Sequence, residues 1–180
     1  MKRTLCLLLC LLMLFCIGCK NEEPEQTPQL NKGTFYMSDG KQYNTHVKIK
    51  LTSTDLTTAA TTLSVEVQND TDYVILIRDD PEKLPWEKFE NGQWIKVPPI
   101  PYGIDENGDY PDIAFKFPPL LPRSTTSKTN EFTELEAGSY RLRVTVDVTD
   151  EQSPLAPGED YKLSAATRCI AELRFDIVPG

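Results

Sequence analysis

The chain has 180 residues, of which 39% are hydrophobic and 26% are charged, and its formal net charge is −8. This length suits a single domain with a tail. So acidic a chain repels the nucleic-acid backbone, and it has no basic stripe interleaved with aromatic residues, so we expect no nucleic-acid partner.

Residues 1–18 have the organisation of a secretory signal. Lys2 and Arg3 form a short basic start, and Leu5 to Ile17 form an apolar run of about a dozen residues. A run of this length is too short to span a bilayer, which takes about 20 residues. The segment therefore predicts export rather than a transmembrane anchor.

The end of this segment, Cys16-Ile17-Gly18-Cys19, resembles the bacterial lipobox. In lipoproteins with that motif the cysteine is acylated and the chain is cut just before it. The resemblance therefore implies cleavage between Gly18 and Cys19, a lipid on Cys19, and a place in the cell envelope as an outer-membrane lipoprotein. Two or three acyl chains, at about 0.8 kcal/mol per buried methylene, hold a protein firmly on a membrane. An ordinary secretory signal, with Cys16 and Gly18 as the small residues before the cut, is the alternative.

Residues 19–33 are predicted to form a lipidated, flexible tether, because Lys20 to Lys32 are polar and include prolines. The run Lys20-Asn21-Glu22-Glu23 resembles the acidic export tags of some Gram-negative surface lipoproteins, which implies surface display. A solvated linker is the alternative. Without Lys2 and Arg3, 27 acidic residues face 17 basic ones. We therefore expect the body to stand off an anionic membrane.

From residue 34 to residue 180 the dominant pattern is an alternation of apolar and polar side chains, which is typical of half-buried β-strands. It is clear at Val47, Ile49 and Leu51, which alternate with lysines. The continuous apolar run 73–77 suits a central strand. The segments predicted as strands are 46–51, 63–68, 73–77, 86–90, 93–97, 140–148 and 168–178.

Turn residues separate these strands. Asn91-Gly92 predicts a hairpin between 86–90 and 93–97. Fourteen prolines gather between strands, where no backbone donor is required. No stretch of ten or more residues has convincing helical periodicity. These patterns predict an all-β fold, a two-sheet antiparallel sandwich of seven or eight strands.

Three pieces of the sequence carry a family resemblance, and they are 65–71 (VEVQNDT), 86–97 (WEKFENGQWIKV) and 135–142 (LEAGSYRL). The stretch from about Met37 to Val178 resembles a bacterial immunoglobulin-like domain of envelope proteins. The resemblance implies an immunoglobulin-like sandwich over residues 34–180, although the paired inter-sheet cysteines of antibody domains are missing. Members act mostly as structural or adhesive modules, and the resemblance brings no known ligand with it.

Aromatic residues are the candidates for ligand binding. Trp86, Trp94 and Tyr102 lie in the middle third of the chain near carboxylates, and exposed aromatic faces in such settings can stack on sugar rings. The alternative is a packing role, in which Trp94 covers the core and the others contact proline rings.

Oxygen ligands occur at alternate positions in one acidic loop, at Asp105, Asn107 and Asp109, as in the first half of a calcium loop. Tyr110 and Lys116 stand where an EF-hand requires glycine and glutamate, so a solvated loop is the alternative. His46 is the only histidine, which leaves little material for a zinc site or a serine–histidine relay. We expect no cofactor and no catalytic residue.

Two further residues are predicted to be structural. Leu135, Gly138 and Tyr140 have the spacing of a tyrosine corner, in which the hydroxyl bonds back to the backbone. Cys169, the one cysteine beyond Cys19, alternates with apolar residues and is expected to be a buried filler rather than a reactive thiol.

The resulting hypothesis is a lipid-anchored, non-catalytic envelope protein. Its immunoglobulin-like domain would bind a protein partner in adhesion or assembly, because sheet edges and end loops offer contact surfaces. The alternative is a surface lipoprotein that binds glycans or small molecules through exposed aromatics. A hydrolase with an unmarked acidic site is a third alternative.

Overall fold

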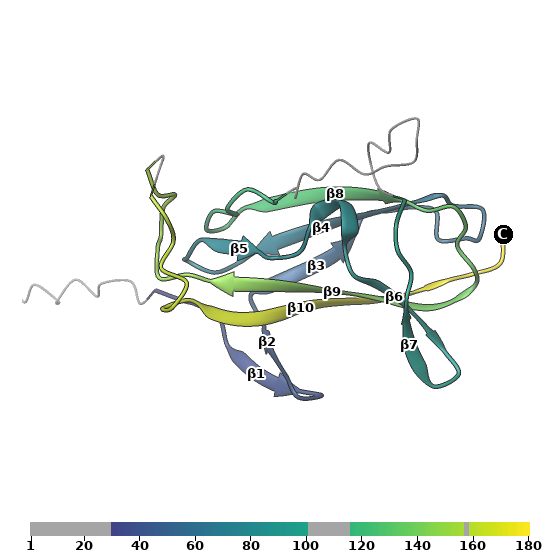
Figure 1. Cartoon of the computed structure of the whole chain (residues 1–180), viewed down its shortest axis with the longest axis horizontal. Helices are drawn as coiled ribbons and strands as arrows, with labels where there is room; N and C mark the ends of the chain where they lie inside the picture. The colour runs from purple at the N-terminus through teal and green to yellow at the C-terminus, as the bar shows by residue number, and fades with distance from the viewer. Residues whose placement is uncertain (1–29, 101–115, 157–158) are drawn as a thin grey trace, which may run out of the picture. The chain divides into compact units, whose positions relative to one another are not determined.

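The computed structural model describes residues 30–100, 116–156 and 159–180, and everything below concerns these residues. The chain from Asn31 to Gly180 forms one compact unit. Ten strands build it (Figure 1). They are β1 (Phe35–Ser38), β2 (Lys41–Asn44), β3 (Val47–Leu51), β4 (Thr62–Asn69), β5 (Ile75–Ile77), β6 (Trp86–Glu90), β7 (Gln93–Lys96), β8 (Thr125–Glu131), β9 (Gly138–Val148) and β10 (Thr167–Ile177).

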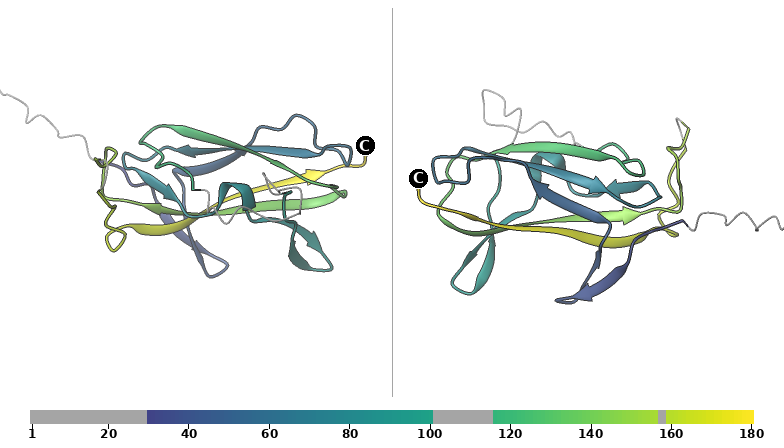
Figure 2. Two further views of the ribbon diagram at one scale, coloured as in Figure 1. Left: turned by 45° about the horizontal axis from the view of Figure 1, so that its top comes forward. Right: turned by 180° about the vertical axis from the view of Figure 1, so that it is seen from behind.

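The strands form two facing sheets, as predicted. The larger has the order β1-β2-β10-β9-β6-β7, with β5 also paired to β9, and the smaller has the order β3-β4-β8. The ladders are antiparallel, except that β2 meets β10 in parallel at the pair Tyr43–Ile170. Figure 2 shows the small sheet lying over β9 and β10 in both views. The predicted all-β sandwich is confirmed.

The core lies between the two sheets, because strand alternation aims one set of side chains inward. In β9 the predicted inward residues, from Tyr140 through every second residue to Val148, are all buried. Val65 and Val67 of β4 meet them from the small sheet. Burying a side chain of this size stabilises the fold by about 1.5–3 kcal/mol.

β5 and β6 share one edge of β9, one after the other. β5 pairs with Val146–Val148 and β6 with Tyr140–Leu142. At the break, Arg78 N–H donates to the carbonyl of Thr145 at 2.9 Å, and the carboxylate of Asp79 accepts from Thr145 N–H at 2.5 Å. Asp79 therefore replaces a strand acceptor where the ladder is interrupted. Asp79 is half-buried, and this burial raises its pKa.

Two hairpins leave the large sheet on the side away from the small sheet (Figures 1 and 2). In the β6–β7 hairpin, Asn91 and Gly92 have φ angles of 49° and 81°. Asp39 and Gly40 of the β1–β2 hairpin have φ angles of 43° and 74°. Positive φ at both central residues suits the twist of a two-residue hairpin turn, so the Asn-Gly prediction is confirmed.

Three strands were not predicted, namely β1, β2 and β8. In β8 only Asn130 is buried, so the strand lacks the apolar alternation that marks the others. The run 73–77 forms a strand only from Ile75. Tyr73 and Val74 belong instead to the turn after β4, where the side chains of Asn69 and Thr71 bind the carbonyl of Tyr73.

Candidate functional site

The structure separates the aromatic residues that the sequence grouped. Trp86 opens β6 with only 1% of its surface exposed, and its indole N–H donates to Asn130 Oδ1 at 3.0 Å. Its ring packs edge-on against Phe132 and Phe175. Trp86 is therefore a core residue whose polar atom has an internal partner, and its ring does not reach the surface. Tyr102 lies outside the described residues.

Trp94 lies on the β6–β7 hairpin, across from Phe89, with the two ring centroids 5.1 Å apart. The guanidinium of Arg141 on β9 lies 4.2 Å from the Trp94 ring centroid, and that of Arg174 on β10 lies 5.7 Å from it. Each such cation–π contact contributes about 0.5–1 kcal/mol at an exposed site. The two arginines therefore hold the indole in one orientation against the sheet.

An open cleft of about 450 Å³ lies between this hairpin and the adjoining ends of β9 and β10. We call it the aromatic cleft. Phe89 is 45% exposed, and Ser139 Oγ donates to Asp176 Oδ1 at 2.6 Å. The residues that line it are Phe89, Trp94, Ser139, Tyr140, Arg174, Phe175 and Asp176.

The arginines around the aromatic cleft are paired with carboxylates. Arg141 Nε donates to Glu87, and Arg174 Nε donates to Glu172 at 2.6 Å. Glu172 also accepts from Arg143. Burial raises the pKa of Glu172, but the hydrogen bonds from Arg143 and Arg174 outweigh burial and hold this pKa below its usual value. The carboxylate therefore stays ionised, and the arginines carry no surplus positive charge into the cleft.

A second cleft, of about 420 Å³, lies where the β1–β2 hairpin, β3 and β10 meet. We call it the edge cleft. On the hairpin side, the rings of Tyr36 and Tyr43 stack with centroids 5.4 Å apart. Burial, followed by the hydrogen bond to Asp39, raises the pKa of Tyr43 to about 12, so its hydroxyl keeps its proton. The two clefts share Arg174.

Two strand edges open onto the edge cleft. Asp70 N–H bonds to the carbonyl of His46, and Thr52 N–H bonds to that of Ser64, so the even-numbered residues of β3 direct their backbone groups toward β4. The backbone groups of Val47, Ile49 and Leu51 point away from β4, because successive residues of a strand direct their N–H and C=O groups to opposite sides. No ladder among the described residues pairs with this edge of β3.

The same reasoning applies to β10. Ile170 meets β2, and Val178 N–H bonds to the carbonyl of Leu56, both on the side away from β9. Between them the backbone groups of Glu172, Arg174 and Asp176 point the same way. In the described part of the chain, no strand pairs with them. Unpaired edges of this kind can accept another strand.

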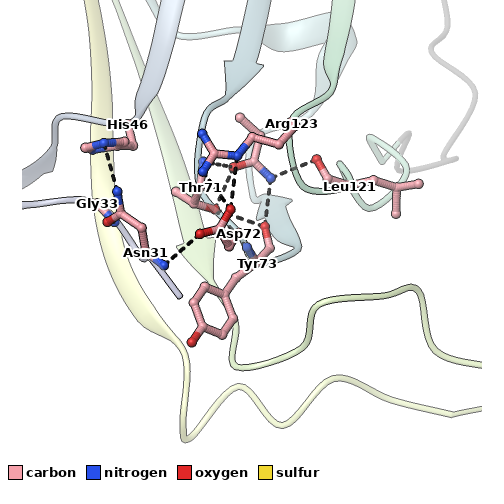
Figure 3. Close-up of polar contacts among 9 residues, drawn as sticks. Asn31, Gly33, His46, Thr71, Asp72, Tyr73, Leu121 and Arg123 are labelled. Carbon is pink, nitrogen blue, oxygen red and sulfur yellow. Dashed lines mark hydrogen bonds and ion pairs between the residues drawn. The ribbon is translucent and has the colours of Figure 1, made fainter. Parts of the chain in front are cut away.

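A polar cluster fixes the point at which the chain enters the domain (Figure 3). Asn31 and Asp72 exchange hydrogen bonds, with Asn31 N–H donating to Asp72 Oδ2 at 2.8 Å and Asp72 N–H donating to the Asn31 carbonyl at 2.9 Å. Arg123 donates twice to Asp72 Oδ1, at 3.0 and 2.6 Å. The Asn31 N–H, and then Arg123, hold the pKa of Asp72 below its usual value. Asn31–Gly33, expected at the end of the tether, are thus bonded to the domain.

The two structural predictions are confirmed. Tyr140 Oη donates to the carbonyl of Glu136 at 2.8 Å, which is the bond of a tyrosine corner. Cys169 is 1% exposed, and burial raises the pKa of its thiol to about 12. A thiol in this state is not a nucleophile at neutral pH.

Several predicted site residues lie outside the described residues, namely Gly18 and Cys19 of the lipobox and Asp105, Asn107 and Asp109 of the acidic loop. Within the described ranges, no group of three or more His, Cys, Asp or Glu side chains could hold a metal ion. His46 contacts Asn31 Nδ2 and Thr45 Oγ1. No helix in the same ranges is long and apolar enough to cross a membrane.

Two facing antiparallel sheets with a tyrosine corner define the immunoglobulin-like class of β-sandwiches. A family model described as bacterial Ig-like domain matches residues 43–167, which is more than half of the chain. The chain therefore belongs to this family. Comparisons with curated proteins and with solved structures found no match.

Sequence reasoning missed most residues of both clefts. Phe89, Arg141 and Arg174 lie in three segments that were predicted only as strands, 86–90, 140–148 and 168–178. An aromatic pair at Phe89 and Trp94, in register across an Asn-Gly turn, was the available signal. The arginines left no such signal, because β9 and β10 lie about fifty and eighty residues further along the chain.

Proposed function

We propose that this protein is a lipid-anchored protein of the bacterial outer membrane, and that its Ig-like domain is a non-catalytic module that binds a protein partner in adhesion or assembly. The family match supports the interaction role, since such domains act mostly as structural or adhesive modules. The lipobox-like end of residues 1–19 supports the anchor.

The observation that carries the interaction role is the pair of open edges at the edge cleft. An extended segment of a partner can add to a free edge through backbone hydrogen bonds, and neighbouring pockets then select its side chains. On β3, the unpaired backbone groups of Val47, Ile49 and Leu51 can bond to such a segment. On β10, the unpaired backbone groups of Glu172 and Arg174 can do the same. Lys48 and Lys50 line the same cleft and favour a partner with acidic side chains.

Site-directed photo-crosslinking in intact cells tests the partner. A photoreactive residue replaces Lys50, which lines the edge cleft, and in a matched strain it replaces Lys96, an exposed lysine on β7. We expect one discrete protein adduct from position 50 that is missing from position 96. The same adducts from both positions, or none from position 50, would contradict the proposal.

Incorporation of labelled palmitate tests the anchor separately. Cys19→Ala should lose the label and retain the mass of residues 1–18, whereas Cys10→Ala, a change within the apolar run, should keep the label and be cleaved. Mass spectrometry of the N-terminal peptide reads both features. Labelling of the Cys19→Ala protein would exclude this cysteine as the acylation site.

A further inference from the structure

We propose that the aromatic cleft is a binding site for a neutral saccharide. One sugar ring packs between the rings of Phe89 and Trp94, which are tilted by 54° to each other, and its hydroxyls bond to Asp176, Ser139 and Arg174. This function is additional to partner binding at the edge cleft and does not depend on it. The argument rests on the size of the cleft, its platform, its polar rim and its charge.

The size of the cleft suits a small ligand. About 450 Å³ lies within the 300–1,000 Å³ typical of ligand pockets. The cleft is open to solvent rather than enclosed, so a longer saccharide can extend beyond the ring that is bound.

The platform is apolar and held in place, and it consists of an exposed Phe89 and a half-buried Trp94. Phe89 is 45% exposed, and its ring adjoins that of Trp94. Arg141 and Arg174 fix the indole before any ligand arrives. A site that is already ordered loses less side-chain freedom on binding. Pyranose rings have one face of C–H groups, which packs on aromatic rings, while their hydroxyls remain at the edge and require polar partners.

The rim supplies those polar partners. Ser139 Oγ donates to Oδ1 of the exposed Asp176, and no described residue bonds to Oδ2, which can accept from a sugar hydroxyl. The Arg174 side chain is 60% exposed, and its Nε donates to Glu172. Its terminal N–H groups can therefore donate to a sugar hydroxyl. A carboxylate beside a guanidinium offers both acceptors and donors, as a hydroxyl-rich ligand requires.

The charge of the cleft favours a neutral ligand. Arg141 is paired with Glu87, and Arg174 with Glu172, so a carboxylate balances the positive charge of each guanidinium at the cleft. Asp176 adds a negative charge, and the chain as a whole carries −8. An anionic ligand would therefore be repelled.

The test uses the full-length protein in detergent and a panel of neutral polysaccharides covering glucans, mannans, galactans and xylans, with chondroitin sulfate as an anionic probe. Isothermal titration measures each affinity. We expect at least one neutral polysaccharide to bind and chondroitin sulfate to give no heat. Trp94→Ala and Phe89→Ala should each weaken binding roughly tenfold, as lost aromatic stacking predicts. Asp176→Asn, which preserves shape, should weaken it roughly fivefold through one altered hydrogen bond.

Two variants serve as controls. Ile95→Ala removes an exposed side chain from the same hairpin, and Tyr36→Ala removes an exposed ring from the β1–β2 hairpin. Both should bind as the unaltered protein does. Circular dichroism confirms that each variant is folded, and Asp176→Asn keeps the test decisive if the tryptophan variant is not.

Three results would overturn the saccharide site. They are no binding to any neutral polysaccharide, binding that survives both Trp94→Ala and Asp176→Asn, and a protein adduct from a photoreactive residue at Phe89. The position-50 adduct expected for the edge cleft should survive Trp94→Ala. Each function can therefore fail while the other stands.

Discussion

At the end of β4, the side-chain amide of Asn69 ties three chain segments together. It is fully buried, and its Nδ2 donates to the carbonyls of Tyr73 at 2.8 Å and Leu121 at 2.9 Å. Its Oδ1 accepts from both the N–H and the hydroxyl of Thr71. One side chain thus satisfies backbone groups that the turn would otherwise leave unpaired inside the protein.

Asn69→Ala should therefore be strongly destabilising. It leaves several buried groups without partners, each of which costs about 1–3 kcal/mol, so we expect a loss of about 3 kcal/mol in the free energy of unfolding. Urea denaturation measures it. Thr129→Ala removes only the exposed bond to Ser64 and should cost about 0.5 kcal/mol. Equal losses in the two variants would contradict the role of Asn69.

Asp79 should be important for a different reason, because it completes the interrupted edge of β9. Asp79→Ala leaves the Thr145 N–H without its acceptor and should cost about 1–3 kcal/mol. Asp79→Asn keeps an oxygen at this place and should cost less. Thermal denaturation at neutral pH ranks the two variants, and the reverse order would contradict this assignment.

The pH dependence of Asp79→Asn follows from the raised pKa. As pH rises through the ordinary value of 3.8, the unfolded chain releases this proton before the folded one does, so the folded form loses stability until the raised pKa is passed. Asparagine does not titrate. The stability of Asp79→Asn relative to the unaltered protein should therefore improve between about pH 3 and pH 7. A constant difference across that range would show that the pKa of Asp79 is not raised.

At the scale of residues, the sequence predicted what depends on local spacing. The tyrosine corner at Tyr140 and the burial of Cys169 both follow from neighbours along one strand. The two tryptophans could not be separated in this way, since both lie in the same hairpin. Trp86 is in the core because its position on β6 faces the small sheet, and that depends on pairing with β9.

At the scale of elements, the β6–β7 hairpin depends on its turn. Gly92 has a φ of 81°, and a side chain added there would meet nothing within 4 Å. Gly92→Ala should therefore cost about 1 kcal/mol through the backbone alone. Gly92→Asn should cost less, because asparagine tolerates this conformation. Urea denaturation compares them, and an alanine variant as stable as the unaltered protein would contradict the assignment.

Which strands could be predicted depended on whether alternation was visible. β4, β9 and β10 each bury one set of apolar side chains, and all three were predicted. β8 forms because its backbone pairs with β4, and its side chains are threonine, serine, lysine, asparagine and glutamate. Pairing with a distant strand leaves no local signal in such a sequence. The clefts were missed for the same reason, since each requires strands that are far apart in the chain.

At the scale of the whole molecule, the domain begins where the polar cluster of Figure 3 begins. Removing residues 1–30 should leave the free energy of unfolding unchanged. Extending the deletion through Gly33 removes both hydrogen bonds between Asn31 and Asp72 and the bond from Asn44 Nδ2 to the Lys32 carbonyl. About 1 kcal/mol should be lost for each of these bonds.

Urea denaturation of the two shortened proteins checks this prediction. The three residues between the end points are the only difference, so the shorter deletion is the matched control. Identical midpoints would show that Asn31–Gly33 contribute nothing to the domain and belong to the tether in energetic terms as well as in sequence.

Because Cys169 of β10 is buried in the core between the two sheets, its reactivity reports on local opening of the fold. In the processed, lipidated form that we propose, Cys169 would be the one remaining thiol of the sequence. A maleimide can reach the Cys169 thiol only when β10 separates from its neighbours. The rate of alkylation therefore measures how often the sandwich opens locally. The free energy of opening can then be measured without engineering a cysteine into the protein.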